Sequence, residues 1–280
     1  MKAKYVNPFT DFGFKKIFGE EASKPMLIDF LTSLLPESNI VDLTFKDKDQ
    51  NGHTEDDRKA VYDIYCENSF GERIIVELQK VKQNYFKDRT VYYATFPIQN
   101  QAEKGIWDYK LNFVYCVGIL DFKFEEKVKP GEGEVIHTVQ LKDQNNQVFY
   151  EKLKFVYLEM PHFVKEQHEL QTRLDKWLYF IKHLEDFQNI PEMFDDTIFR
   201  QAFEKAEIAK YNEDEMYDYQ QSLKVFRDNK NTFDYAKETA FDEGKIEERL
   251  KIAKALKQKG VPTNIIMETT GLSESEINEL

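Results

Sequence analysis

The sequence predicts an α/β fold with a mixed β-sheet, followed by a helical C-terminal region. Apolar spacing over the first 120 residues indicates the order helix–strand–strand–strand–helix–strand. A long helical segment between two strands is the crossover that parallel strands need, whereas a short connection is typical of an antiparallel hairpin. Both kinds of connection occur here, so we expect a sheet with both kinds of pairing.

Two helices are expected at the start of the chain. Asp11 can cap the first, which ends near Gly19, and the second begins near Ser23 and ends before Pro36. An alternating run at 40–46 then predicts the first strand.

Three further strands complete the predicted core. AVYDIYC at 60–66 and RIIVELQ at 73–79 are expected to form a hairpin, and the nearly continuous apolar run at 111–120 suits a strand buried on both faces. The intervening pattern predicts a helix from about 85 to 104, which Pro97 should kink or restart because proline lacks a backbone donor.

The polar stretch 47–57 is expected to be a loop. Beyond the core, runs at 135–141 and 148–160 flank DQNNQ and predict an added hairpin, and the pattern is helical from Lys165 onward. We predict three segments: a core with the added hairpin (1–163), a helical region (164–244) and a short basic helical tail (245–280).

The composition excludes several classes of protein. Apolar residues make up 41% of the 280 and aromatic residues 14%, which excludes disorder as the main state. No apolar run approaches the roughly 18–20 residues that span a bilayer, and the N-terminus lacks the apolar core of a signal peptide. We therefore expect a cytoplasmic protein without a membrane partner, with Cys66 and Cys116 as buried free thiols.

Charge is unevenly distributed along the chain. The formal net charge is −12, but eleven acidic and three basic residues lie within 185–218, whereas 245–259 has six basic and two acidic residues. The acidity is regional, so the net charge does not count against a nucleic-acid partner.

The predicted hairpin carries the residues that could perform chemistry. Because side chains alternate along a strand, Glu77 and Gln79 should project from the same side, and Asp63 on the adjacent strand can share that side. Two carboxylates placed together repel each other unless a cation bridges them, and Mg²⁺ prefers oxygen ligands. From spacing alone, two solvent-facing acids on an ordinary hairpin remain the alternative.

Several motifs resemble the Rpn recombination-promoting nucleases, which are also described as PD-(D/E)XK nuclease family transposases. The motifs occur in order over most of the chain: NPFTDFGFKKIFG, DRKAVYDIYC, IIVELQ, YFKDRTVYYA, LKFVYLEMPHF and DKWLYFIKH. The resemblance implies a PD-(D/E)XK restriction-endonuclease-like core of the order αβββαβ.

The resemblance also implies roles for individual residues. Asp63 would be the aspartate that bridges metal, Glu77 the second acidic ligand, and Asp11 an outer ligand. Gln79 stands where the superfamily usually has lysine; it lacks the cation but can still orient a water. Tyr62 replaces the proline of the namesake motif.

Basic residues surround the same hairpin and form a cationic rim: Arg58, Lys80, Lys82 and Arg89. The resemblance makes Arg58 and Arg89 candidates for phosphate contacts, and we expect the two lysines to contribute to DNA binding. Lys80 should point to the opposite face of its strand, which makes it a poor substitute for the missing lysine.

The sequence therefore predicts an endonuclease that hydrolyses DNA with Mg²⁺, or Mn²⁺, and low sequence specificity, linked by its family to recombination or mobile elements. Two alternatives stay open: a DNA- or partner-binding protein that has lost turnover, and a protein-interaction module built on helices 164–259. The 245–280 tail is either a small DNA-contacting unit or a helical appendage that could form a homodimer contact.

Overall fold

The computed structural model describes residues 3–50, 60–103, 105–125 and 127–280. Contacts divide the chain into two units, Met1–Phe226 and Arg227–Leu280, which are described separately below. The division into segments at residues 163 and 244 stays a prediction.

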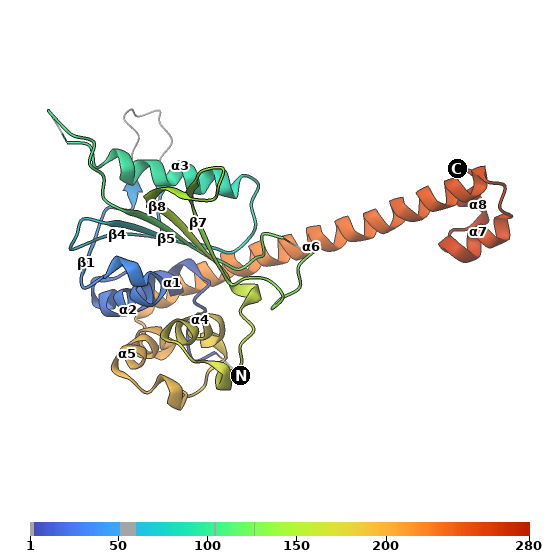
Figure 1. Ribbon diagram of the computed structural model, residues 1–280. Helices are drawn as coiled ribbons and strands as arrows, with labels where there is room; N and C mark the ends of the chain where they lie inside the picture. The colour runs from blue at the N-terminus through green and yellow to red at the C-terminus, as the bar shows by residue number, and fades with distance from the viewer. Residues whose placement is uncertain (1–2, 51–59, 104, 126) are drawn as a thin grey trace. The chain divides into compact units, whose positions relative to one another are not determined.

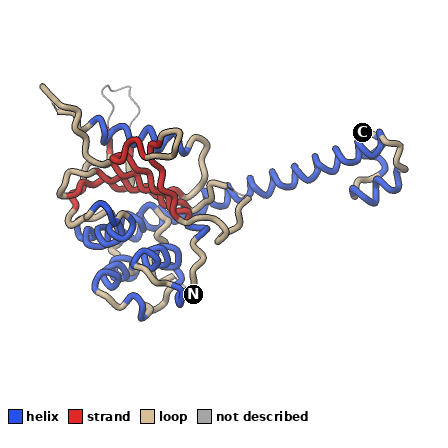
Figure 2. Tube along the Cα trace, viewed as in Figure 1, coloured by secondary structure: helices blue, strands red, loops and turns tan. Residues whose placement is uncertain are grey.

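A six-stranded mixed sheet lies at the centre of the first unit (Figures 1 and 2). Its strands, in spatial order, are β1 (Leu43–Phe45), β4 (Ile64–Asn68), β5 (Arg73–Gln79), β6 (Val114–Leu120), β8 (Val148–Glu159) and β7 (Ile136–Lys142). The β5–β6 and β6–β8 pairs are parallel, and the other pairs are antiparallel. The predicted mixed sheet is confirmed, and the added hairpin β7–β8 extends it.

Helices cover both faces of this sheet (Figure 1). On one face lies α3 (Phe86–Gln99), which packs on apolar residues such as Ile75 and Cys116. On the other lie α1 (Asp11–Phe18) and α2 (Lys24–Leu34), with α4 (Arg173–His183) and α5 (Thr197–Ala206) packed against them. Alternate side chains of each central strand thus enter two separate hydrophobic cores.

Three local details differ from the sequence predictions. Thr10, not Asp11, caps α1, because its hydroxyl oxygen accepts a hydrogen bond from the Gly13 N–H at 3.0 Å; Asp11 is the first helical residue. The helix α3 contains Pro97 near its end and stops at Gln99 instead of restarting. The predicted strand at 40–46 is reduced to the three residues of β1.

The predicted strand at 60–66 is interrupted at Asp63. Its first part, β3 (Ala60–Val61), leaves the main sheet and pairs with β2 (Asp49–Gln50) in a small two-stranded sheet. Part of the expected loop is therefore strand, and residues 51–57 lie outside the described residues.

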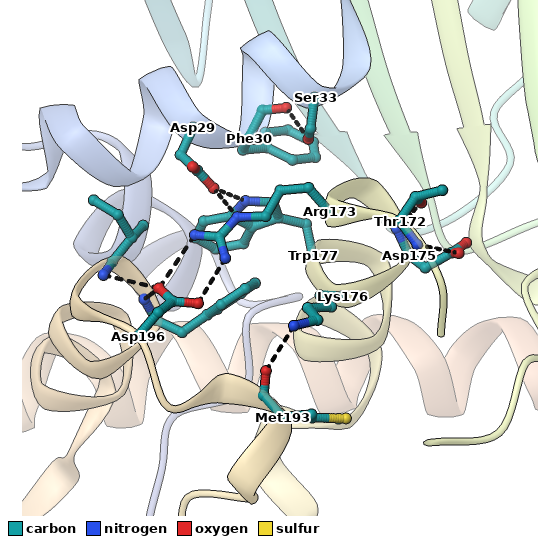
Figure 3. A network of polar contacts seen from close by, with 12 residues as sticks. Asp29, Phe30, Ser33, Thr172, Arg173, Asp175, Lys176, Trp177, Met193 and Asp196 are labelled. Carbon is teal, nitrogen blue, oxygen red and sulfur yellow. Dashed lines mark hydrogen bonds and ion pairs between the residues drawn. The ribbon is translucent and has the colours of Figure 1, made fainter. Parts of the chain in front are cut away.

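A partly buried polar network joins α4 to α2 and α5 (Figure 3). The Arg173 guanidinium donates to Asp29 Oδ2 at 2.7 Å and to Asp196 Oδ2 at 2.6 Å, and the Trp177 indole N–H donates to the same Asp29 oxygen at 2.6 Å. Asp196 also caps α5 through the backbone N–H groups of its first turn. One arginine thus connects three helices behind the sheet.

The helix α6 (Glu213–Gln258) belongs to both units. Within the first unit its N-terminal turns pack on α1: Lys16 Nζ lies 2.5 Å from Glu215 Oε1, and the Phe12 N–H donates to Ser222 Oγ at 3.0 Å. No described helix is long and apolar enough to cross a membrane.

The second unit closes a small core between the end of α6, α7 (Thr263–Thr270) and α8 (Glu274–Asn278). Gly260 and Gly271 end their helices with φ of 73° and 70°, a backbone region that favours glycine. Ser273 and Glu276 form the predicted capping box, with both hydrogen bonds present.

We predict that Arg173→Met lowers the free energy of unfolding by about 2 kcal/mol, because it leaves two partly buried carboxylates without their cation. Chemical denaturation measures this loss. Arg200→Met is the matched control, since Arg200 pairs with Asp195 at the surface, where an ion pair contributes about 0–1 kcal/mol. Equal losses in the two variants would contradict the proposed importance of the network.

Candidate active site

The site is built where β3 separates from β4. Continuing the β4–β5 register places Asp63 opposite Glu77, since Ile64 pairs with Val76. Two hydrogen bonds cross between the strands at this point: the Leu78 N–H donates to Asp63 Oδ2 at 2.7 Å, and the Asp63 N–H donates to Glu77 Oε1 at 3.3 Å. The two carboxylates are therefore held next to each other by the backbone of the opposite strand.

Both carboxyl groups are poorly solvated. Burial raises the pKa of Asp63, and the nearby charge of Asp11 raises it further, against the opposing effect of the Leu78 hydrogen bond. Burial and the charge of Asp63 raise the pKa of Glu77 to about 8. Ionising both groups is thus unfavourable in the isolated chain, and a cation bound between them would offset that cost.

Gln79 lies on the α3 face of the sheet, together with Glu77. The Arg89 guanidinium donates to Gln79 Oε1 and, at 2.9 Å, to Gln83 Oε1, while Gln79 Nε2 donates to the Val81 carbonyl oxygen at 2.9 Å. The charge of Arg89 also lowers the pKa of Glu77 in part. In this arrangement Arg89 brings positive charge to the α3 side of the site, and both the oxygen and the nitrogen of the Gln79 amide have protein partners.

The other predicted basic residues spread in different directions. Lys80 lies on the α1 side, where it interacts with Asp11 and Asp63. The Lys82 ammonium donates to the Phe124 carbonyl oxygen at 2.6 Å, in the loop after β6. Arg58 lies outside the described residues. A continuous rim is therefore not formed by the described cations.

Asp11 lies near the pair but is engaged elsewhere. Its carboxylate forms an ion pair with Lys15 at 2.8 Å, while its charge still acts on Asp63. Within the described ranges, no group of three or more Asp, Glu, His or Cys side chains is arranged to hold a metal ion. The structure thus brings two of the three predicted acidic ligands into contact and leaves the third beside them.

The donor chemistry of the pair fits a hard divalent cation. Asp63 and Glu77 offer carboxylate oxygens, the ligands that Mg²⁺ and Mn²⁺ prefer, and Mg²⁺ sites commonly use only one or two carboxylates. Burial raises the pKa of Glu77 and the charge of Asp63 raises it further, so a cation held by both groups would favour their ionised forms.

Sequence reasoning missed one residue at this site. Lys48 lies just before β2, interacts with Asp63 and lines a cavity of about 560 Å³ with Asp11, Lys15 and Lys80. No sequence signal distinguished it, because it falls in a polar stretch that we expected to be a loop. Only the pairing of β2 with β3 brings it to the site.

Comparison with known families agrees with this fold. Residues 8–236 match the PD-(D/E)XK nuclease family transposases, and residues 247–280 match the C-terminal helix-turn-helix domain of the Rpn/YhgA-like nuclease family. The chain therefore belongs to the PD-(D/E)XK nuclease family transposases, of the Rpn type. No curated protein and no solved structure matches it.

The raised pKa of Glu77 predicts how stability depends on pH in the metal-free protein. An unfolded glutamate titrates near about 4.3, so the stabilisation is complete below that pH and is lost as pH rises through about 8. In EDTA, the free energy of unfolding should fall by a few kcal/mol between pH 5 and pH 8.5. Glu77→Gln, which cannot ionise, should largely remove this fall.

Denaturation curves at several pH values measure the effect. Glu67→Gln on the same hairpin is the control and should keep the wild-type dependence. If the wild type and Glu77→Gln follow parallel curves, the carboxylate is not desolvated as described.

Proposed function

We infer that the protein is a Mg²⁺-dependent DNA endonuclease that hydrolyses phosphodiester bonds with low sequence specificity. The observation that carries this proposal is the half-buried Asp63–Glu77 pair, joined by two hydrogen bonds between adjacent strands in a chain of the PD-(D/E)XK nuclease family. Membership of the family supports nuclease chemistry and a link to mobile elements or recombination.

The proposed mechanism assigns each residue a task. Asp63 and Glu77 would hold the cation, Mg²⁺ or Mn²⁺, which when bound would supply Lewis-acid polarisation of the phosphodiester and of water. Hydrogen bonds from the opposite strand keep the two carboxylates from separating when they ionise. Asp11 adds negative charge nearby and serves as an outer ligand.

Arg89 and Gln79 act on the α3 side of the pair. Arg89 favours the ionised form of Glu77, the form that binds a cation. It also fixes the Gln79 amide, which in our proposal exchanges its Val81 contact for a water when substrate is bound. Lys80, Lys82 and Arg58 contribute contacts to the DNA backbone, which carry no sequence information.

DNA is the partner that this proposal requires. The helix-turn-helix match at residues 247–280 supports a second DNA contact. The cations available there lie on the last turns of α6 and at Lys259 just after it, since residues 261–280 contain no lysine or arginine. We further propose that the protein acts in the cytoplasm and can form a homodimer.

We predict that Asp63→Asn and Glu77→Gln each slow the nicking of supercoiled plasmid on the order of 10²–10³-fold or more, because each removes a metal-binding charge. EDTA should abolish the wild-type reaction. Glu67→Gln, on the same hairpin, should nick at the wild-type rate. Equal nicking by the wild type and both site variants would refute the assignment.

A DNA-binding protein without turnover is the second candidate. Two observations favour it: the helix-turn-helix match, and glutamine at the position where the superfamily usually has lysine. Salt-dependent DNA binding without cleavage in Mg²⁺ or Mn²⁺ would select this candidate.

The tail generates a separate prediction. Lys251 and Lys254 lie three residues apart on an exposed part of α6, so removing both as Lys251→Ala/Lys254→Ala should weaken DNA binding in EDTA. The slope of log K against log salt concentration should decrease by about 0.9 for each lost phosphate contact. Lys224→Ala/Arg227→Ala, equally spaced on the same helix but outside the helix-turn-helix match, is the control and should leave the slope unchanged. Identical slopes for the two double variants would exclude a DNA contact at these two lysines.

A further inference from the structure

A cavity of about 560 Å³ opens on the α1 side of the carboxylate pair. Asp11 and Lys15 line it from α1, Lys48 from the segment before β2, and Lys80 from the end of β5; the part of α6 in the first unit closes the opposite wall. Lys48 and Lys80 both interact electrostatically with Asp63, which places the cavity next to the proposed metal ligands.

Most charges that face the cavity already have a partner. Asp11 pairs with Lys15 at 2.8 Å. Glu20 pairs with Lys16 at 3.0 Å and with Lys205 at 2.8 Å. These groups neutralise one another and hold α1 in place, so they are poor candidates for a ligand.

Two lysines differ from the others. Over the described part of the chain, neither Lys48 nor Lys80 has a carboxylate oxygen within 4 Å, and burial lowers the pKa of both side chains. Asp218 also lines the cavity, but it is exposed on α6. Two partly desolvated ammonium groups that share a cavity, and that form no ion pair with the described carboxylates, are suited to bind an anion.

The backbone explains why these lysines lie beside the site. The Tyr62 N–H donates to the Lys48 carbonyl oxygen at 3.1 Å, so the β2–β3 pairing places Lys48 next to the break at Asp63. Lys80 follows Gln79 and, by strand alternation, projects to the opposite face of the sheet. The cations thus reach the carboxylate pair from the α1 side, whereas Arg89 reaches it from the α3 side.

We propose that Lys48 and Lys80 bind the phosphate oxygens of the DNA backbone in this cavity and supply the positive charge that Gln79 cannot. The proposal rests on the proposed nuclease function and identifies the face from which the phosphodiester enters the site. Ammonium groups donate to non-bridging phosphate oxygens, and their attraction strengthens as negative charge develops during hydrolysis. Lys48 in particular is a phosphate-binding residue that lies outside every sequence motif of the site.

The test uses the full-length protein with Lys48→Met and Lys80→Met, and with Lys46→Met as the matched control. Lys46 lies two residues from Lys48, but its ammonium pairs with Glu67 at 3.3 Å and does not line the cavity. Circular dichroism and thermal denaturation establish that each variant is folded. Lys48→Arg keeps the charge and should restore most of what Lys48→Met loses.

Two measurements in EDTA identify the ligand. Affinity for inorganic phosphate and for a 20-base-pair duplex should each fall about tenfold or more in both Met variants, since a hydrogen bond to a charged group is lost. Lys46→Met should match the wild type in both measurements. A different result would be that both Met variants bind the duplex as tightly as the wild type but bind inorganic phosphate more weakly. The cavity would then bind free phosphate, and the assignment to the DNA backbone would be overturned.

Plasmid nicking in Mg²⁺ then tests the catalytic part. Both Met variants should lose about 10²-fold in maximal rate, and the Mg²⁺ concentration for half-maximal activity should not rise, because the lysines contact phosphate and the loss of a positive charge near Asp63 does not weaken cation binding. Wild-type rates in both variants would overturn the proposal while leaving the nuclease function intact. A third result would be duplex binding by the wild type that depends on the two lysines, without any nicking. It would refute the nuclease function and leave the cavity assigned to DNA phosphate.

Discussion

The pair of hydrogen bonds that joins Asp63 to β5 is the interaction on which the proposed site depends. The chain leaves the regular strand at Asp63, and the Asp63 carboxylate accepts a hydrogen bond from the Leu78 N–H of β5. The same step turns the Asp63 N–H toward Glu77, so one local break in a strand both collects and orients two acids. In a regular antiparallel pair, the backbone N–H groups of Asp63 and Leu78 would donate to backbone carbonyl oxygens, and the two carboxylates would lack these donors.

Two neighbouring carboxylates that are poorly solvated are unfavourable in free energy when both are ionised. Cations lie near them on both faces of the sheet. Arg89 extends from α3 to Gln79, while Lys48 and Lys80 approach Asp63 from the side of α1. None of these cations forms an ion pair with the acids that would neutralise them fully, and the pKa of Glu77 stays raised at about 8. In our proposal, a site with this charge distribution binds a divalent cation and a phosphate together, since each ligand offsets the charge of the other.

The residues that stabilise the helices around the site differ from those proposed to perform its chemistry. The network around Arg173 joins α2, α4 and α5 and includes neither Asp63 nor Glu77. Tight packing there, with Trp177 fully buried, fixes α2 and α5 against α1, which lines the cavity and carries Asp11. The helices α4 and α5 share one hydrophobic core with a face of the sheet.

Most elements of the core were evident from the sequence, because apolar periodicity is a local property: the strand 73–79, the buried strand near 111–120 and the two N-terminal helices follow from spacing and capping residues. The pairing of Glu77 with Gln79 on one face follows from strand alternation in the same way. What only the tertiary structure decided is the position of groups that depend on long-range pairing. Lys48 reaches Asp63 only because β2 pairs with β3, and Arg89 contacts Gln79 only because the crossover helix α3 packs beside β5. No periodicity or motif in the sequence predicts either contact. Sequence patterns describe residues that are close along the chain, whereas the burial and charge at this site depend on segments that are distant in the chain.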